Sequence, residues 1–233
     1  MTTKKISDII ARSSWFKGLP NEAQQTLAVN AKIENFKKDS FIYHIGDNSK
    51  TIFCVLSGRV RISVLSTQGQ KFSVDDYGPE EWVGESGLVS SDIQISEIQF
   101  IEAGQALSLS YHTVSAVGKD YPIMYYSILQ DHIRRTRGVY QILRTMVFHP
   151  LKSRLAGRIL FMLKSIGVKA EDGYYLDQKL NQQDFANFAH GSRQRVNQIL
   201  KEWDKEGIIT IKDNRYFIRD LVRLKQEVYK AEA

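Results

Sequence analysis

The spacing of apolar positions changes along the chain and divides it into segments of different secondary structure. Residues 1 to about 30 carry apolar residues at helical spacing with a break at Gly18–Pro20, which predicts two helices. From about Ala31 to Ser115, short β-rich runs alternate with turns, which is typical of an antiparallel roll or sandwich. The glycines at or near the expected corners are Gly46, Gly58, Gly69, Gly78 and Gly84. We predict that residues 1–118 form one domain.

A single long helix is predicted over residues 119–148. Asp120 can cap it, and Pro122 lies in the first turn, where a missing N–H is harmless. Residues spaced alternately by four and three form one seam of a coiled coil, namely Tyr126, Leu129, Ile133, Thr136, Tyr140, Leu143 and Val147. The seam predicts a dimerisation helix about 39 Å long from Pro122 to Val147. The alternative is a helix packed only against its own β-domain.

The remaining residues, 149–233, predict a winged helix-turn-helix. His149 precedes a proline and is disfavoured from helical angles, so we expect a hinge at residues 148–150. A helix from Leu151 to about Ser165 and a short strand at 174–176 come next. Two helices joined by a tight turn follow within residues 180–207. Two strands on either side of Lys212-Asp213-Asn214 predict the wing, and a helix from Leu221 to Tyr229 closes the chain.

The pair of helices at residues 180–207 carries the clearest functional pattern. Asn181 and Ser192 can cap the two helices, and Gly191 can supply a positive φ between them. The first helix places Phe185, Phe188 and Ala189 on one face, and the second buries Val196, Ile199, Leu200 and Trp203. The opposite face of the second helix carries Arg193, Gln194, Asn197, Gln198 and Lys201. All five can donate hydrogen bonds, so this helix suits the major groove of DNA. An ordinary amphipathic surface helix is the alternative.

The charge distribution favours an anionic partner for the C-terminal part. The chain of 233 residues has a net charge of +6. From His149 onward the chain has 16 Lys and Arg and 11 Asp and Glu, a net charge of +5. The first 148 residues have 16 Lys and Arg and 15 Asp and Glu, a net charge of +1. The modest basic excess therefore lies around the predicted helix-turn-helix, and it favours DNA as the partner.

The residues from Gln182 to Ile209, with the pattern QQD-A, GSRQ, VN-IL-EW and KEGII, resemble the helix-turn-helix of the Crp-Fnr superfamily of bacterial transcription regulators. The resemblance is weaker over the rest of the chain. It implies a homodimer that inserts a recognition helix, residues 192–206, into each half of an inverted repeat. The implied base contacts are Arg193, Gln194, Asn197 and Gln198. The implied phosphate contacts are Asn181, Gln183, Ser192, Arg195 and Lys201. Gln194 and Gln198 depart from the glutamate and arginine common in the family, so its usual half-site does not transfer whole.

The resemblance also implies an effector pocket in the β-roll. Gly84, Glu85 and Ser86 match the start of the family's phosphate-binding cassette, where the glutamate holds a ribose hydroxyl. Val139 and Tyr140 align with the nucleotide-contacting hydroxyl pair of the long helix, where only Tyr140 keeps a hydroxyl. The family's arginine is absent, because no Lys or Arg occurs between Glu85 and Lys119. A buried phosphate without a cation is costly, so we expect an effector other than cyclic AMP, or none.

Other cofactors and classes fit less well. Haem ligation by His44, His112 or His132 is an alternative, but lone histidines are more often structural. One cysteine, Cys54, excludes a multi-cysteine cluster, and its apolar surroundings predict a core residue. The sequence has no catalytic motif, apolar membrane span or signal-peptide core, so we expect a cytoplasmic, non-enzymatic protein with RNA polymerase as a further partner. A cyclic-nucleotide regulatory module that binds no DNA is the third class.

Overall fold

The computed structural model describes residues 3–89, 93–212 and 215–229, and the chain divides into two compact units, Met1–Gly138 and Val139–Ala233. The boundary between the units lies inside the long helix α5, Ile123–Phe148. The predicted boundaries at 118 and 148 instead follow the ends of that helix and stay a prediction.

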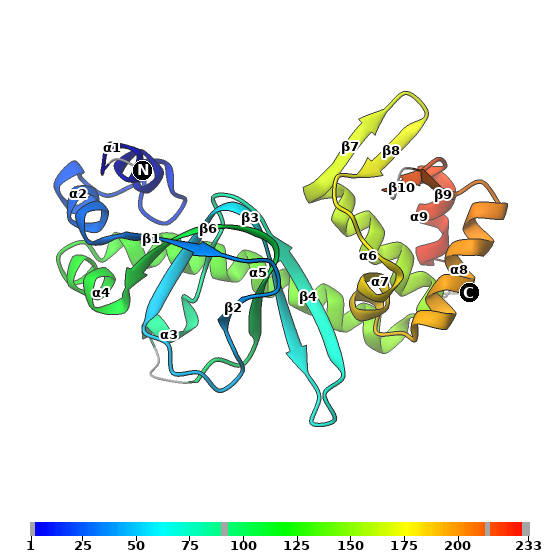
Figure 1. The fold of residues 1–233 in the computed structure, drawn as a ribbon, viewed down its shortest axis with the longest axis horizontal. Helices are drawn as coiled ribbons and strands as arrows, with labels where there is room; N and C mark the ends of the chain where they lie inside the picture. Colours follow the sequence, from blue (N-terminus) through cyan, green and yellow to red (C-terminus); the bar gives the residue numbers. More distant parts are fainter. Residues whose placement is uncertain (1–2, 90–92, 213–214, 230–233) are drawn as a thin grey trace. The chain divides into compact units, whose positions relative to one another are not determined.

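The first unit is an antiparallel β-roll with helices packed on it (Figure 1). Its sheet has the order β1-β6-β3-β4, with β2 paired to β6 and β5 paired to β3. The strands are β1 Lys32–Phe36, β2 Phe41–Tyr43, β3 Thr51–Leu65, β4 Lys71–Tyr77, β5 Trp82–Val83 and β6 Glu97–Ser110. The helices before α5 are α1 Thr3–Arg12, α2 Asn21–Asn30, α3 Ser86–Val89 and α4 Tyr111–Asp120. Gly46, Gly58, Gly69 and Gly84 take positive φ at the corners, but Gly78 does not.

Aromatic side chains join the N-terminal helices to the roll. Trp15 stacks on Trp82 with ring centroids 5.4 Å apart, and Phe16 meets Trp82 edge to face at 5.0 Å. All three rings are buried. Such pairs add about 0.5–1.5 kcal/mol each beyond their buried area. The segment between α1 and α2 is therefore held in the core of the first unit.

The residues between the roll and the long helix correct two predictions. The β-pattern does not continue to Ser115, because Ser110 caps α4 by accepting a hydrogen bond from the backbone N–H of Thr113 at 3.1 Å. Asp120 is consequently the last residue of α4 rather than the cap of the long helix, which begins after Pro122. Burial of Val114 and Val117 stabilises α4, and their spacing of three residues also suits a helix.

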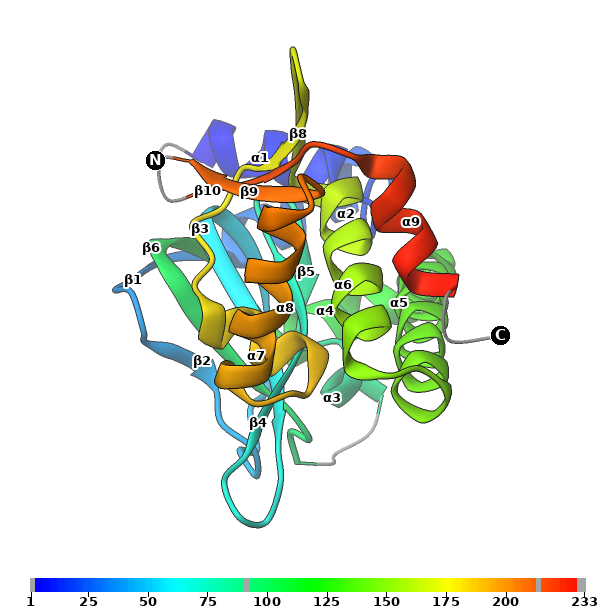
Figure 2. The same cartoon turned by 90° about the vertical axis from the view of Figure 1, so that its right-hand side faces the viewer.

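The second unit has the predicted winged helix-turn-helix architecture (Figure 2). Its helices are α6 Leu151–Ile166, α7 Gln182–Ala189, α8 Arg193–Lys205 and α9 Leu221–Tyr229. Its antiparallel sheet has the order β7-β8-β10-β9, formed by β7 Gly167–Ala170, β8 Gly173–Leu176, β9 Ile209–Lys212 and β10 Arg215–Ile218. The prediction missed β7, and the predicted turn residues Asp213 and Asn214 lie outside the described residues. Helix α6 packs against α7, α8 and α9 around one core that includes Phe185, Phe188 and Trp203.

Candidate nucleic-acid interface

Helix α7 begins at a reciprocal hydrogen-bonded cap. Asn181 Oδ1 accepts from the backbone N–H groups of Gln183 and Asp184 at 2.8 and 3.0 Å, and Asp184 Oδ2 accepts from Asn181 N–H at 2.8 Å. These bonds satisfy three backbone donors that the helix itself leaves without partners. The cap therefore fixes where α7 starts, as predicted.

The turn between α7 and α8 differs from the prediction in one residue. His190, not Gly191, takes the left-handed conformation, with φ of 50°. Gly191 is needed for space: a Cβ there would lie 2.5 Å from Leu151 Cδ1. The glycine therefore allows the turn to pack closely on α6.

Helix α8 is oriented by its buried stripe. Ser192 Oγ accepts from Arg195 N–H at 3.3 Å, and Val196, Ile199, Leu200 and Trp203 are buried as predicted. With this stripe in the core, α8 exposes the predicted base-contact residues Arg193, Gln194 and Gln198. Among the predicted phosphate contacts, Asn181, Gln183, Ser192, Arg195 and Lys201 are also exposed.

Asn197 is placed differently from the other predicted base contacts. It is half-buried, and its Oδ1 accepts a hydrogen bond of 2.8 Å from Gln182 Nε2 on α7. This bond joins the two helices of the motif. Gln198 Nε2 lies 3.4 Å from Glu202 Oε1 within α8, a longer contact that leaves the exposed amide able to exchange partners.

A hollow of about 400 Å³ lies where the starts of α7 and α8 meet the wing. Asn181, Gln182 and Arg193 line it from the two helices, Lys179 from the preceding segment, and Tyr216 from β10. Backbone N–H groups at a helix start and cationic side chains are the partners that phosphate oxygens prefer. Lys179 and Tyr216 were not among the predicted contacts, because they precede α7 and follow α8 in sequence.

Arg154 on α6 is a further residue that the pattern did not indicate. Its guanidinium donates to the carbonyl oxygens of Ala189, His149 and His190 at 2.9, 3.2 and 3.0 Å. Partial burial and the nearby charge of Arg195 lower the pKa of Arg154. Two neighbouring cations beside the turn favour an anion at the start of α8.

The predicted effector residues fall in both units. Gly84 has φ of 93°, and a Cβ there would meet Tyr43 Oη and the carbonyl oxygen of Thr51. Glu85 is nearly buried, whereas Ser86 is exposed. Val139 and Tyr140 begin the second unit on α5, with exposed side chains.

A cation does lie beside Glu85, although none follows it in the same segment. Arg135 of α5 places Nη1 3.8 Å from Glu85 Oε2 and Nη2 2.6 Å from Asp131 Oδ2. Its guanidinium also lies 4.6 Å from the ring centre of Tyr77. Burial would lower the pKa of Arg135, but Tyr77 and the two carboxylates outweigh it and raise the pKa. Arg135 was not among the predicted site residues; its i,i+4 spacing from Asp131 is a signal for an ion pair on the helix, but spacing cannot place that pair against the roll.

The seam residues of α5 are largely exposed in the single chain. The six apolar members have exposed fractions of 42–68 %. Thr136 is half-buried, and its hydroxyl donates to the carbonyl oxygen of His132 at 2.9 Å. Exposed apolar side chains at this spacing are typical of a helix that packs against a partner helix.

The remaining candidates for metal or redox chemistry are Cys54, His44, His112 and His132. Cys54 is buried in β3 as predicted, and burial raises the pKa of its thiol to about 12. His44 and His132 lie 3.9 and 3.3 Å from the carboxylates of Glu97 and Glu85, and His112 is exposed. Within the described ranges, no group of three or more His, Cys, Asp or Glu could hold a metal ion. No helix in the described part of the chain is long and apolar enough to cross a membrane.

The fold and the exposed face of α8 define a helix-turn-helix DNA-binding protein with a β-roll domain. Comparison with known families agrees: residues 33–121 match the cyclic nucleotide-binding domain, and residues 153–227 match the Crp-like helix-turn-helix domain. The chain belongs to the Crp-Fnr superfamily of transcription regulators.

The chain is similar to proteins whose names refer to different signals. The CRP-like cAMP-activated global transcriptional regulator of Mycobacterium tuberculosis is 22% identical over 219 residues, covering 94% of this chain and 98% of that protein. The global nitrogen regulator of Synechocystis is 24% identical over 198 residues, covering 84% of this chain and 88% of that protein. Among solved structures, that of the c-di-GMP responsive regulator CLP of Xanthomonas campestris has a TM-score of 0.76 at 17% identity, covering 86% of this chain and 100% of that chain. The two sequence relatives are named as regulators and not as enzymes, as expected for this chain.

Proposed function

We propose that the protein is a homodimeric transcription regulator that binds an inverted-repeat DNA site. The observation that carries the proposal is the exposed face of α8, which presents Arg193, Gln194 and Gln198. The first turn of this helix contains no acidic residue. Arg can donate two hydrogen bonds to guanine, and Gln can pair with adenine. The proposed phosphate contacts are Asn181, Gln183, Ser192, Arg195 and Lys201, while Asn197 holds the helix pair together through Gln182.

The exposed seam of α5 supports the homodimer, because its apolar residues would be buried against a second copy of the helix. A two-fold dimer requires an inverted repeat with half-site centres about 10 bp apart or a multiple of this. We infer that such a regulator acts in the cytoplasm on RNA polymerase, which the relatives' roles as global regulators support.

Selection from random DNA duplexes tests the proposal. The wild-type protein should enrich an inverted repeat, and a variant with Arg193→Ala and Gln194→Ala should lose that enrichment while keeping its thermal unfolding temperature. Because both side chains are exposed, the substitutions should leave the core intact. Enrichment of no motif by the wild type would contradict the proposal and favour a module that binds no DNA.

We infer that the effector is not cyclic AMP. The support is that the segment after Glu85 supplies no cation, while Arg135 is already neutralised by Asp131 and Glu85. A cyclic phosphate would have to break these contacts. Titration calorimetry with cyclic AMP should show no binding at micromolar concentration.

A cyclic-nucleotide-responsive regulator is the second candidate, and Arg135 is the observation that favours it. The family's pocket needs a cation near the glutamate, and Arg135 could serve if it exchanged Asp131 for a phosphate. A dissociation constant of a few micromolar, lost in Arg135→Gln, would establish this candidate and overturn the first.

A further inference from the structure

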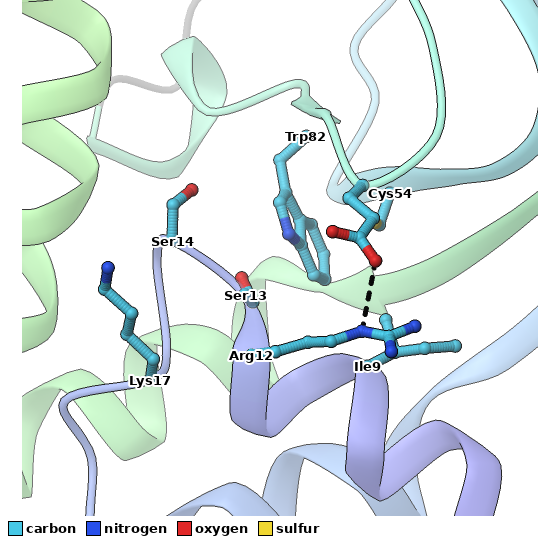
Figure 3. A pocket seen from close by; sticks show the side chains of 8 residues that line it. Ile9, Arg12, Ser13, Ser14, Lys17, Cys54 and Trp82 are labelled. Carbon is cyan, nitrogen blue, oxygen red and sulfur yellow. Dashed lines mark ion pairs between the residues drawn. The ribbon is translucent and has the colours of Figure 1, made fainter.

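A small cavity in the first unit lies between the end of α1 and the β-roll (Figure 3). Its volume is about 170 Å³. The helix and the turn after it supply Arg12, Ser14 and Lys17, and the roll supplies Cys54 and Trp82. A cavity of about 150 Å³ can hold one benzene molecule, so this one has room for a ligand of similar size.

One wall of the cavity carries a buried hydrogen-bond donor without a protein partner. The side chain of Trp82 is only 1 % exposed, and its Nε1 makes no hydrogen bond to any described residue. In Figure 3 the nitrogen-bearing edge of this ring lies on the side of Ser14 and Lys17. The stacked Trp15 differs, because its Nε1 donates to Asp131 Oδ2 at 3.0 Å. Buried donors normally have partners, so the bare N–H of Trp82 points to a ligand or water.

The charged residues that line the cavity are two cations, Arg12 and Lys17, and one anion, Glu80. Arg12 Nε lies 3.1 Å from Glu80 Oε1, in an ion pair whose two side chains are exposed. The ammonium of Lys17 forms no ion pair with any residue that the structure describes. Ser14 and Lys17 are exposed, so both side chains can change rotamer to admit a ligand.

We propose that this cavity binds a small organic monoanion, a carboxylate with an apolar body. The carboxylate accepts from Trp82 Nε1 and pairs with Lys17, and the apolar body lies against Ile9 and the Trp82 ring. The site is distinct from the residues around Glu85 and does not depend on the proposed DNA binding. A bound ligand would touch Trp82, which stacks on Trp15. Trp15 in turn donates a hydrogen bond to Asp131 of α5, so the ligand would lie two residues away from that helix.

Titration calorimetry of the full chain with benzoate tests the site, with benzyl alcohol as the uncharged probe. Benzoate should bind one site per chain with a dissociation constant below about 1 mM, and benzyl alcohol about tenfold more weakly. Trp82→Phe keeps an aromatic six-membered ring but removes the five-membered ring with its N–H, so it should lower the thermal unfolding temperature through the space it leaves in the core. It should also lose benzoate affinity about tenfold, because a charge-assisted hydrogen bond is lost.

Lys17→Gln should lower the affinity by a similar factor, and Lys119→Gln, an exposed charge elsewhere in the unit, should not change it. Absence of saturable benzoate binding would overturn the proposal. Binding that is unchanged in both Trp82→Phe and Lys17→Gln would place the ligand elsewhere and overturn it as well. If Trp82→Phe failed to fold, the two lysine variants would test the proposal: equal benzoate affinity in Lys17→Gln and Lys119→Gln would overturn it. DNA selection by the wild type is a separate measurement, so either proposal can fail alone.

Discussion

The indole N–H of Trp15 donates to Oδ2 of Asp131 at 3.0 Å, across 116 residues of sequence. The same carboxylate pairs with Arg135, which reaches Glu85 at the start of α3. The N-terminal turn, the roll and α5 are thus connected through one carboxylate in the first unit.

Asp131→Asn should lower the free energy of unfolding at pH 7 by about 1–3 kcal/mol, because the nearly buried Arg135 loses a charged partner. Burial raises the pKa of Asp131, but Arg135 and the bonds from Arg134 and Trp15 outweigh it and lower the pKa overall. The stabilisation is therefore complete above the unfolded pKa of about 4 and disappears as pH falls through the lower folded pKa. Urea denaturation at several pH values measures this, with the exposed Asp120→Asn as control. A difference between wild type and Asp131→Asn that stayed constant down to pH 2 would contradict it.

Replacing Leu129 and Leu143 together by Asp should convert the protein to monomers, because two charges per helix would be buried in the seam. Light scattering measures the mass. Gln141→Asp adds a charge on α5 outside the seam and should leave the dimer intact. An unchanged dimer in the double variant would show that another surface joins the subunits.

Arg193→Ala should cost about 1–3 kcal/mol on the selected DNA site and relax preference at one base pair per half-site. Arg195→Ala should weaken all sequences alike and lower the salt slope by about one per subunit. Random-duplex selection and binding at several salt concentrations distinguish the two roles. If only Arg195→Ala altered the selected motif, the assignment of the helix faces would be reversed.

Gly191→Ala should destabilise the protein by about 1–3 kcal/mol, because its Cβ would collide with the buried side chain of Leu151. Gly157→Ala is the matched control: its Cβ would meet nothing within 4 Å. Since Gly157 lies within α6, that substitution should stabilise by up to about 1 kcal/mol. Thermal unfolding measures both. A neutral Gly191→Ala would mean that Leu151 can move without cost.

The sequence alone determined the elements whose signals are local. The caps at Asn181 and Ser192, the buried stripe of α8 and the extent of α9 all follow from spacing within one or two helical turns. The seam of α5 was evident for the same reason. Such patterns survive in isolation, because a residue three or four positions away is a neighbour in any helix.

Tertiary structure decided the features that depend on distant partners. Leu151 of α6 requires Gly191 in the turn, whereas His190 takes the left-handed angles. Gln182 engages Asn197, and Arg135 comes to lie beside Glu85 although fifty residues separate them in sequence. Spacing cannot reveal these contacts, because hydrogen bonds, ion pairs and steric limits act through space, and only the packed chain brings the atoms within a few ångströms.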